Sequence, residues 1–94
     1  HGYNSVINIT KEIEFKLWGY EDAREVILSG GFNDWSTNEL QMEQKDGYWV
    51  AKVDLSGGKH HYKFIVDGQW MIDPTNSVAE YDGEGNINSV CMVK

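Results

Sequence analysis

The stretch HHYKFIVDGQWMID, residues 60–73, constrains the fold more than any other part of the chain. Its large apolar residues alternate along a predicted strand, with Tyr62, Phe64 and Val66 on one face and Lys63 and Ile65 on the other. The dipeptide Asp67-Gly68 that follows is a strong two-residue turn signal, so we expect a β-hairpin. Trp70 comes just after this turn, and we expect its ring to be held beside the turn, instead of in the middle of a strand, as an exposed binding platform.

A second tryptophan follows a strand in a similar way. Residues 26–30 (VILSG) are a short apolar segment typical of a strand, and the loop GFNDW that follows contains Trp35. If the two strands run in the same direction in a sandwich, Trp35 and Trp70 emerge at the same end of it. Two such rings suit a ligand with repeated apolar faces.

Further short strands are predicted at 12–18, around Leu40 and Met42, at 48–55 and at 87–93. Turn signals separate these segments, and no amphipathic helix pattern of useful length is present. About seven short strands predict an all-β fold, an immunoglobulin-like antiparallel β-sandwich. We expect one domain over 12–94, preceded by a lead-in segment or edge strand over 1–11.

The core is expected to consist of large inward-facing side chains: Phe15, Leu28, Trp49, Val53, Tyr62, Phe64 and Val66. Trp49 should lie inside because it alternates with Ala51, whereas Trp18 should lie at the surface or sheet rim. Cys91 is the only cysteine, so this core cannot depend on an internal disulfide.

The charge of the chain bears on its partners. Fifteen acidic residues stand against eight basic ones, which gives a net charge of −7. Nucleic-acid binding depends largely on basic side chains that neutralise phosphates, so we expect no nucleic-acid partner. Anionic membrane surfaces are disfavoured for the same reason, and no apolar run approaches the roughly 20 residues that span a bilayer. The sequence does not indicate a compartment.

No metal or cofactor is expected. His60 and His61 are adjacent in a predicted strand and point to opposite faces, so they cannot chelate one ion together. Asp82, Glu84 and Asn86 have the alternate spacing of calcium ligands, but the glycine and the terminal bidentate glutamate of a calcium loop are absent. A surface loop is the favoured interpretation.

An enzymatic activity is not expected either. Glycoside hydrolysis needs two carboxylates that face each other across a cleft, roughly 5–9.5 Å apart. Asp67 and Asp73 are explained by turns, and there is no nucleophile with a paired histidine.

Three separated motifs occur in order along the chain: GGFNDW, DGYWVAKVDLSGGKHHYKFIVDGQWMIDP and GNINSV. Together they resemble family-48 carbohydrate-binding modules, and more closely the glycogen-binding domains of AMP-activated protein kinase β-subunits. The resemblance covers about residues 12–94. It implies a noncatalytic sandwich that binds α-1,4-linked glucans such as glycogen, starch and maltooligosaccharides.

The resemblance also implies roles for particular residues. Trp35 and Trp70 would stack on glucose rings, Lys63 and Asn88 would hydrogen-bond sugar hydroxyls, and Asn86 would contribute a further side chain. These residue types suit the task, because glucose has an apolar axial face and a hydroxylated rim. The chain departs from the kinase subunits in the loop 82–85 (DGEG), where those have a leucine that reaches through the ring of a cyclic glucan.

Two hypotheses for function remain open. The first is a glucan-binding module that targets an attached catalytic domain or kinase complex to polysaccharide. The second is a protein-interaction sandwich that docks within a larger assembly. The presence of both Trp35 and Trp70 favours the first, since a docking domain has no need of two tryptophan-bearing loops at one end.

Overall fold

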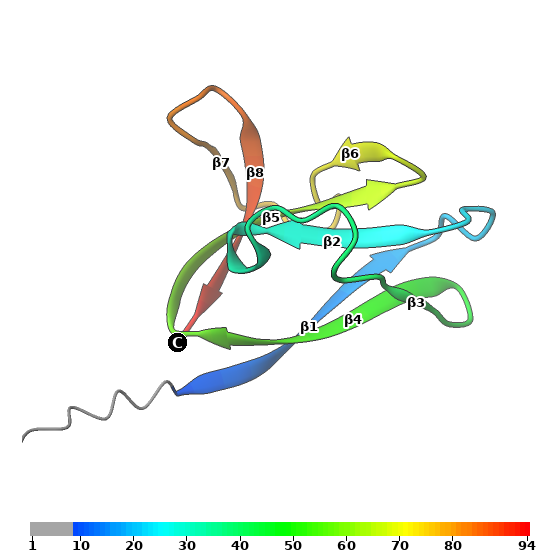
Figure 1. The fold of residues 1–94 in the computed structure, drawn as a ribbon, viewed down its shortest axis with the longest axis horizontal. Coiled ribbons are helices and arrows are strands. Elements are labelled where there is room, and N and C mark those ends of the chain that lie inside the picture. Colours follow the sequence, from blue (N-terminus) through cyan, green and yellow to red (C-terminus); the bar gives the residue numbers. More distant parts are fainter. Residues whose placement is uncertain (1–8) are drawn as a thin grey trace, which may run out of the picture.

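A computed structural model of the protein describes residues 9–94, and these form eight strands and one short helical turn (Figure 1). The elements are β1 (Thr10–Trp18), β2 (Val26–Gly30), η1 (Gly31–Asn33), β3 (Glu43–Gln44), β4 (Tyr48–Ser56), β5 (Gly58–Val66), β6 (Gln69–Met71), β7 (Ala79–Tyr81) and β8 (Ile87–Val93). The predicted all-β class is confirmed, with eight strands in place of about seven. The expected lead-in 1–11 falls mostly outside the described residues, and β1 already begins at Thr10.

The strands form two antiparallel sheets. One has the order β1-β4-β3, and the other has the order β2-β5-β8-β7 with β6 added alongside β5. Figure 1 shows β1 and β4 running beneath β2 and β5, with the β5–β6 and β7–β8 hairpins projecting from the second sheet. This arrangement is the expected sandwich.

One core fills the space between the sheets. Most of the expected core residues are buried, among them Phe64 at 0% exposure and Trp49 at 5%. The Trp49 indole Nε1–H donates to the carbonyl of Tyr20 at 3.0 Å, so its polar atom is satisfied inside. Val53 and Val66 are only partly buried, and they pack at the edge of the core.

A buried polar network connects the loop after β6 to the second sheet. The Tyr62 hydroxyl donates to Asp73 Oδ2 at 2.6 Å and accepts from Asn76 Nδ2 at 3.0 Å. The Asp73 backbone N–H donates to the Ser89 hydroxyl at 2.7 Å. Burial raises the pKa of the Tyr62 hydroxyl well above its usual range, and the bond to Asp73 adds to this shift, so Tyr62 remains a neutral donor.

The predicted hairpin joins β5 to β6. Asp67 and Gly68 have φ angles of 46° and 83°, and positive φ at both central residues defines the type I′ turn that this dipeptide favours. The Asp67 carboxylate also accepts the backbone N–H groups of Arg24 and Glu25, at 2.9 and 3.0 Å, which ties the turn to the segment before β2. The position expected for Trp70 beside the turn was wrong in one respect, because Trp70 is the central residue of β6 and pairs with Ile65.

The strand expected around Leu40 and Met42 is not formed. The backbone of these two residues bonds to Leu28 and Val26 of β2, at 2.9 and 2.8 Å, whereas β3, two residues long, begins at Glu43 and pairs with β4. The chain therefore passes from one sheet to the other within a few residues, so neither pairing can extend into a longer strand.

Candidate functional site

A cavity of about 760 Å³ opens on the outer face of the five-stranded sheet. Its lining residues come from the loop after β2, from β5 and β6, and from the β7–β8 hairpin: Trp35, Lys63, Trp70, Asp82, Gly83, Glu84, Asn86 and Asn88. The five site residues named from the sequence, which come from three separate motifs, thus line one cavity.

The two tryptophans form an aromatic corner in this cavity. Their ring centroids are 6.3 Å apart and the ring planes are tilted by 48°. Trp70 is 46% exposed, as expected, whereas Trp35 is half-buried and presents only part of its ring to solvent. The pair is therefore an angled surface and not a single flat platform.

The loop that holds Trp35 is fixed by its own hydrogen bonds. Asn33 accepts the Gly30 backbone N–H at 3.1 Å and donates to the Leu28 carbonyl at 3.2 Å, and the Trp35 N–H donates to the Gly30 carbonyl at 2.9 Å. Asp34 and Trp35 adopt left-handed backbone angles, with φ of 53° and 57°. This conformation costs about 1–2 kcal/mol per residue, so the bonds of the loop hold Trp35 in a position that a free chain disfavours.

Gly30 lies at the base of this loop, where there is no space for a side chain. A Cβ atom there would come within 2.5 Å of the His61 carbonyl oxygen and 2.6 Å of the Phe32 ring. Close approach of the loop to β5 is therefore possible only with glycine at this position.

Lys63 and Trp70 reach the cavity from the outer face of the sheet. Lys63 pairs with Ser29 of β2, and Ile65 pairs with both Ile27 and Trp70, so these side chains share one face. We expected Ile65 to be outward, and the pairing places it on that face, but it is 5% exposed, and Ile27 and Ser29 are also buried. Lys63 thus extends from a face on which its neighbours Ile27, Ser29 and Ile65 are buried.

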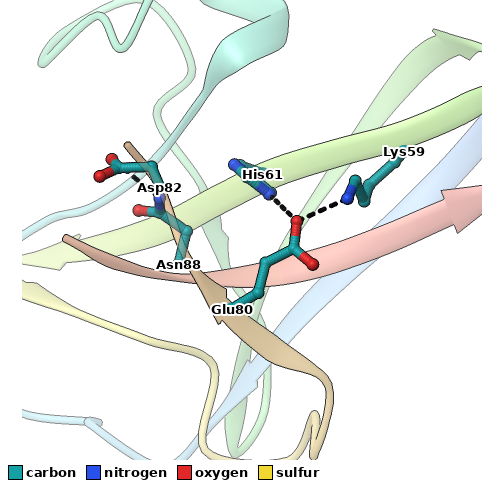
Figure 2. Close-up of polar contacts among 5 residues, drawn as sticks. All are labelled: Lys59, His61, Glu80, Asp82 and Asn88. Carbon is teal, nitrogen blue, oxygen red and sulfur yellow. Dashed lines mark hydrogen bonds and ion pairs between the residues drawn. The ribbon is translucent and has the colours of Figure 1, made fainter. Parts of the chain in front are cut away.

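Asp82 shapes the opposite wall of the cavity, a role not foreseen from the sequence. Its Oδ1 accepts the backbone N–H groups of Glu84 and Asn86 at 2.8 and 3.0 Å, and its Oδ2 accepts from Asn88 Nδ2 at 3.4 Å (Figure 2). These donors, the Glu84 N–H first, hold the pKa of Asp82 below its usual value. In this segment, for which a surface loop was the favoured interpretation over a calcium site, the Asp82 carboxylate binds the backbone of its own loop.

Asp82, Gly83 and Glu84 line the cavity, although the sequence marked this loop only as a departure from the kinase subunits and assigned none of these three residues to ligand binding. A signal was present in the sequence, because an Asx residue followed by glycine commonly closes a turn through its side chain. No group of three or more metal-ligating side chains is found within residues 9–94. The single helical turn in this part of the chain has three residues, much shorter than a membrane-spanning helix.

An antiparallel sandwich with an aromatic corner beside anchored polar side chains has the features of a carbohydrate-binding module. Comparison with known proteins identifies the family. The model described as the glycogen recognition site of AMP-activated protein kinase matches residues 12–94. The chain belongs to this family.

Several relatives are similar over most of the chain. It is 43% identical to subunit beta-2 of human 5'-AMP-activated protein kinase over 74 residues, which are 79% of this chain and 26% of that protein. It is 44% identical to the pig beta-1 subunit over 72 residues, which are 77% of this chain and 57% of that sequence. The chain thus spans about a quarter of the length of the beta-2 relatives.

The fold also occurs in a solved enzyme structure. A maltogenic amylase from S. marinus superimposes with a TM-score of 0.77 at 18% identity, over 88% of this chain and 13% of that one. At this low identity the similarity concerns the fold alone.

Proposed function

We propose that the cavity binds α-1,4-linked glucan, with Trp35 and Trp70 stacking on glucose rings. Lys63, Asn86 and Asn88 would hydrogen-bond the sugar hydroxyls. The observation that supports this function most strongly is that these five residues, from separate motifs, line one cavity whose two indole rings are 6.3 Å apart.

The tilt of the rings favours an α-glucan over a β-glucan. Successive glucose units of an α-1,4-glucan turn relative to one another and give a curved chain, whereas those of a β-1,4-glucan form a flat ribbon. A flat ribbon would need coplanar rings to contact two units at once, but the planes of Trp35 and Trp70 differ by 48°. The angled surface is complementary to a curved chain.

One polar side chain beside the rings, that of Asn88, is held in place before any ligand binds. Asn88 is 3% exposed and donates to Asp82, which is itself bonded to its own loop. Fixed donors and acceptors lose little conformational entropy on binding, so modest hydrogen bonds can still contribute to affinity. We expect dissociation constants of roughly 10 μM to 1 mM for maltooligosaccharides, or about −7 to −4 kcal/mol.

We infer a noncatalytic, targeting role for the domain. It would hold an attached catalytic domain or kinase complex on glycogen or starch. The relatives named above are subunits of a protein kinase, and the chain covers a fraction of their length, which supports a module within a larger protein. The domain alone should release no reducing sugar from starch.

Retention on insoluble polysaccharide tests the function directly. Wild-type domain should be retained on amylose and immobilised glycogen but not on cellulose, and Trp70→Ala should pass through all three. Trp18→Ala is a matched control, because Trp18 is an exposed tryptophan, at 54%, on the other sheet. This control should be retained like wild type. Absence of wild-type retention on both α-glucans would contradict the proposal.

The alternative function, docking to a protein, is supported by one feature of the opposite sheet. Trp18 and Tyr48 are cross-strand neighbours with ring centroids 4.8 Å apart, and the Lys16 ammonium lies 5.6 and 5.0 Å from the two rings. Tryptophan and tyrosine side chains that reach the surface are enriched at protein interfaces. If the wild-type domain does not bind α-glucan, this surface becomes the preferred candidate for function.

A further inference from the structure

The glucan cavity does not end at Asn88. A second cavity, of about 480 Å³, borders it, and the two share Trp35, Asp82 and Asn88 as lining residues. The second cavity is also lined by Phe32 and by His61. Because these three residues border both cavities, a glucan chain that leaves the tryptophan corner past Asn88 reaches the second cavity along the protein surface.

The two cavities follow the same strand. Lys59, His61 and Lys63 lie at alternate positions of β5 and so point to the same outer face. Lys63 lines the first cavity, and Lys59 and His61 line the second. At about 3.3 Å per residue, the distance along the strand from Lys63 to Lys59 is about 13 Å, enough for more than one sugar unit.

A cluster of polar side chains, Lys59, His61 and Glu80, lies at the second cavity. Glu80 Oε1 accepts from His61 Nε2 at 2.6 Å and from Lys59 Nζ at 2.7 Å, and Figure 2 shows the carboxylate between the two side chains. The pairing of β7 with β8 places Glu80 opposite Asn88, beside β5. The hydrogen bonds from Lys59 and then His61 lower the pKa of Glu80, which keeps its carboxylate ionised.

The cluster retains hydrogen-bonding capacity for a ligand. Within residues 9–94, Glu80 Oε2 has no hydrogen-bond partner, and the Lys59 ammonium uses one of its three N–H groups. The side chains remain accessible, at 51% exposure for Lys59 and 40% for Glu80. The remaining N–H groups of the Lys59 ammonium can donate to sugar hydroxyl oxygens while Glu80 holds the ammonium in place.

We propose that the second cavity binds the glucose units that continue past the tryptophan corner, through Lys59 and His61 with Glu80 positioning both. This inference rests on the proposed function and extends the same groove along β5. Aromatic side chains border the new part as they do the first, because Trp35 and Phe32 both line it. The ligand is therefore an α-glucan long enough to occupy both cavities.

Calorimetric titration with two ligand lengths, maltotetraose and maltodecaose, tests the extension. A longer chain binds better for a statistical reason alone, since it offers more registers, so the informative quantity is the ratio of the two affinities in variants relative to wild type. Lys59→Ala and His61→Ala should each reduce maltodecaose affinity about two- to tenfold, as expected for a lost sugar hydrogen bond. Maltotetraose affinity should change less than twofold.

Lys52→Ala provides the control, because it removes one cation from β4 of the opposite sheet and leaves β5 intact. It should bind both ligands like wild type. If Lys59→Ala and His61→Ala keep the wild-type ratio of maltodecaose to maltotetraose affinity, the second cavity does not bind glucan. An equal loss of affinity for both ligands in a variant that melts like wild type would also contradict the proposal. Failure of the wild-type domain to bind either ligand would instead overturn the proposed function itself.

Discussion

The ring centroids of Trp35 and Trp70 are 6.3 Å apart, although Trp35 lies in the loop after β2 and Trp70 in the middle of β6. Each ring contributes one side of the aromatic corner, so a glucan that stacks on one is positioned for the other. Desolvation of a large apolar side chain contributes about 1.5–3 kcal/mol, whereas one added hydrogen bond contributes about 0.5–1.5 kcal/mol.

We therefore expect Trp35→Ala and Trp70→Ala each to abolish detectable glucan binding, and Lys63→Ala to weaken it several-fold. Calorimetry with a maltooligosaccharide measures the affinities, and thermal melting of each variant excludes unfolding. Trp35→Ala should also lower the melting temperature slightly, because Trp35 is half-buried. Wild-type affinity in folded Trp70→Ala would show that the rings do not act as a stacking surface.

Gly30→Ala should disturb the Trp35 loop. The added methyl group would lie 2.5 Å from the His61 carbonyl oxygen, so the loop must move away from β5. Forcing a methyl group into packed structure costs about 1–3 kcal/mol. We expect reduced stability in urea denaturation together with weaker glucan binding.

The neighbouring residue provides a matched control for this change. At Gly31, a Cβ atom meets nothing within 4 Å, so Gly31→Ala adds the same methyl group in open space. It should leave stability and binding close to wild type. Equal behaviour of the two variants would mean that the contact at Gly30 does not determine the position of the loop.

Glucan affinity should depend on pH through the ionisation of Asp82. The pKa of this carboxyl is lowered in the folded protein by the N–H groups of Glu84 and Asn86, relative to its ordinary value of 3.8. Its contribution is therefore fully present above that value and is lost as pH falls through the lowered pKa. We expect affinity to decrease below a pH of about 4, as the loop loses its hydrogen bonds.

Two substitutions identify the side chain that causes this pH dependence. Asp82→Ala should bind weakly at neutral pH and show no further step on acidification, whereas Glu84→Gln should retain the decrease, although Glu84 lines the same cavity. If Glu84→Gln abolishes the decrease and Asp82→Ala keeps it, Glu84 is the titrating group.

Ser29→Ala should be tolerated or stabilising. The Ser29 hydroxyl is fully buried and has no hydrogen-bond partner among the described residues. A buried hydroxyl without a partner costs about 1–3 kcal/mol, so its replacement by a methyl group should raise the free energy of unfolding by about 1 kcal/mol. Chemical denaturation of both proteins measures the difference, and a loss of more than about 1 kcal/mol would indicate that the hydroxyl has a partner.

The strands with regular alternation could be predicted from the sequence, and the short edge strands could not. The 60–66 segment carries a period of two over its whole length and ends in Asp-Gly, so local information specifies both the strand and its turn. The strand at 79–81 has three residues, too few for a period, and exists because it pairs with β8. Its absence from the sequence interpretation also hid Glu80 and the cluster with His61.

The site residues could be named because each stands in a recognisable motif, but the sequence did not reveal what holds them. The hydrogen bond from Asn88 to Asp82 joins two side chains that meet only after the β7–β8 hairpin has formed. The left-handed backbone angles at Asp34 and Trp35, in the loop that holds the Trp35 ring, are likewise not predicted by side-chain patterns.

The Trp35 loop has a consequence for protein engineering. The hydrogen bonds that shape it join residues 28–36 to one another, and its contact with β5 at Gly30 is made to a backbone carbonyl oxygen, an atom that every residue type provides. The loop also rests on the core, because the Phe32 ring packs against Phe15 with ring centroids 5.9 Å apart. Transplanted between two strands of another sandwich at the same spacing, residues 28–36 should therefore keep the orientation of their indole only where the recipient has a large aromatic or apolar side chain beneath Phe32.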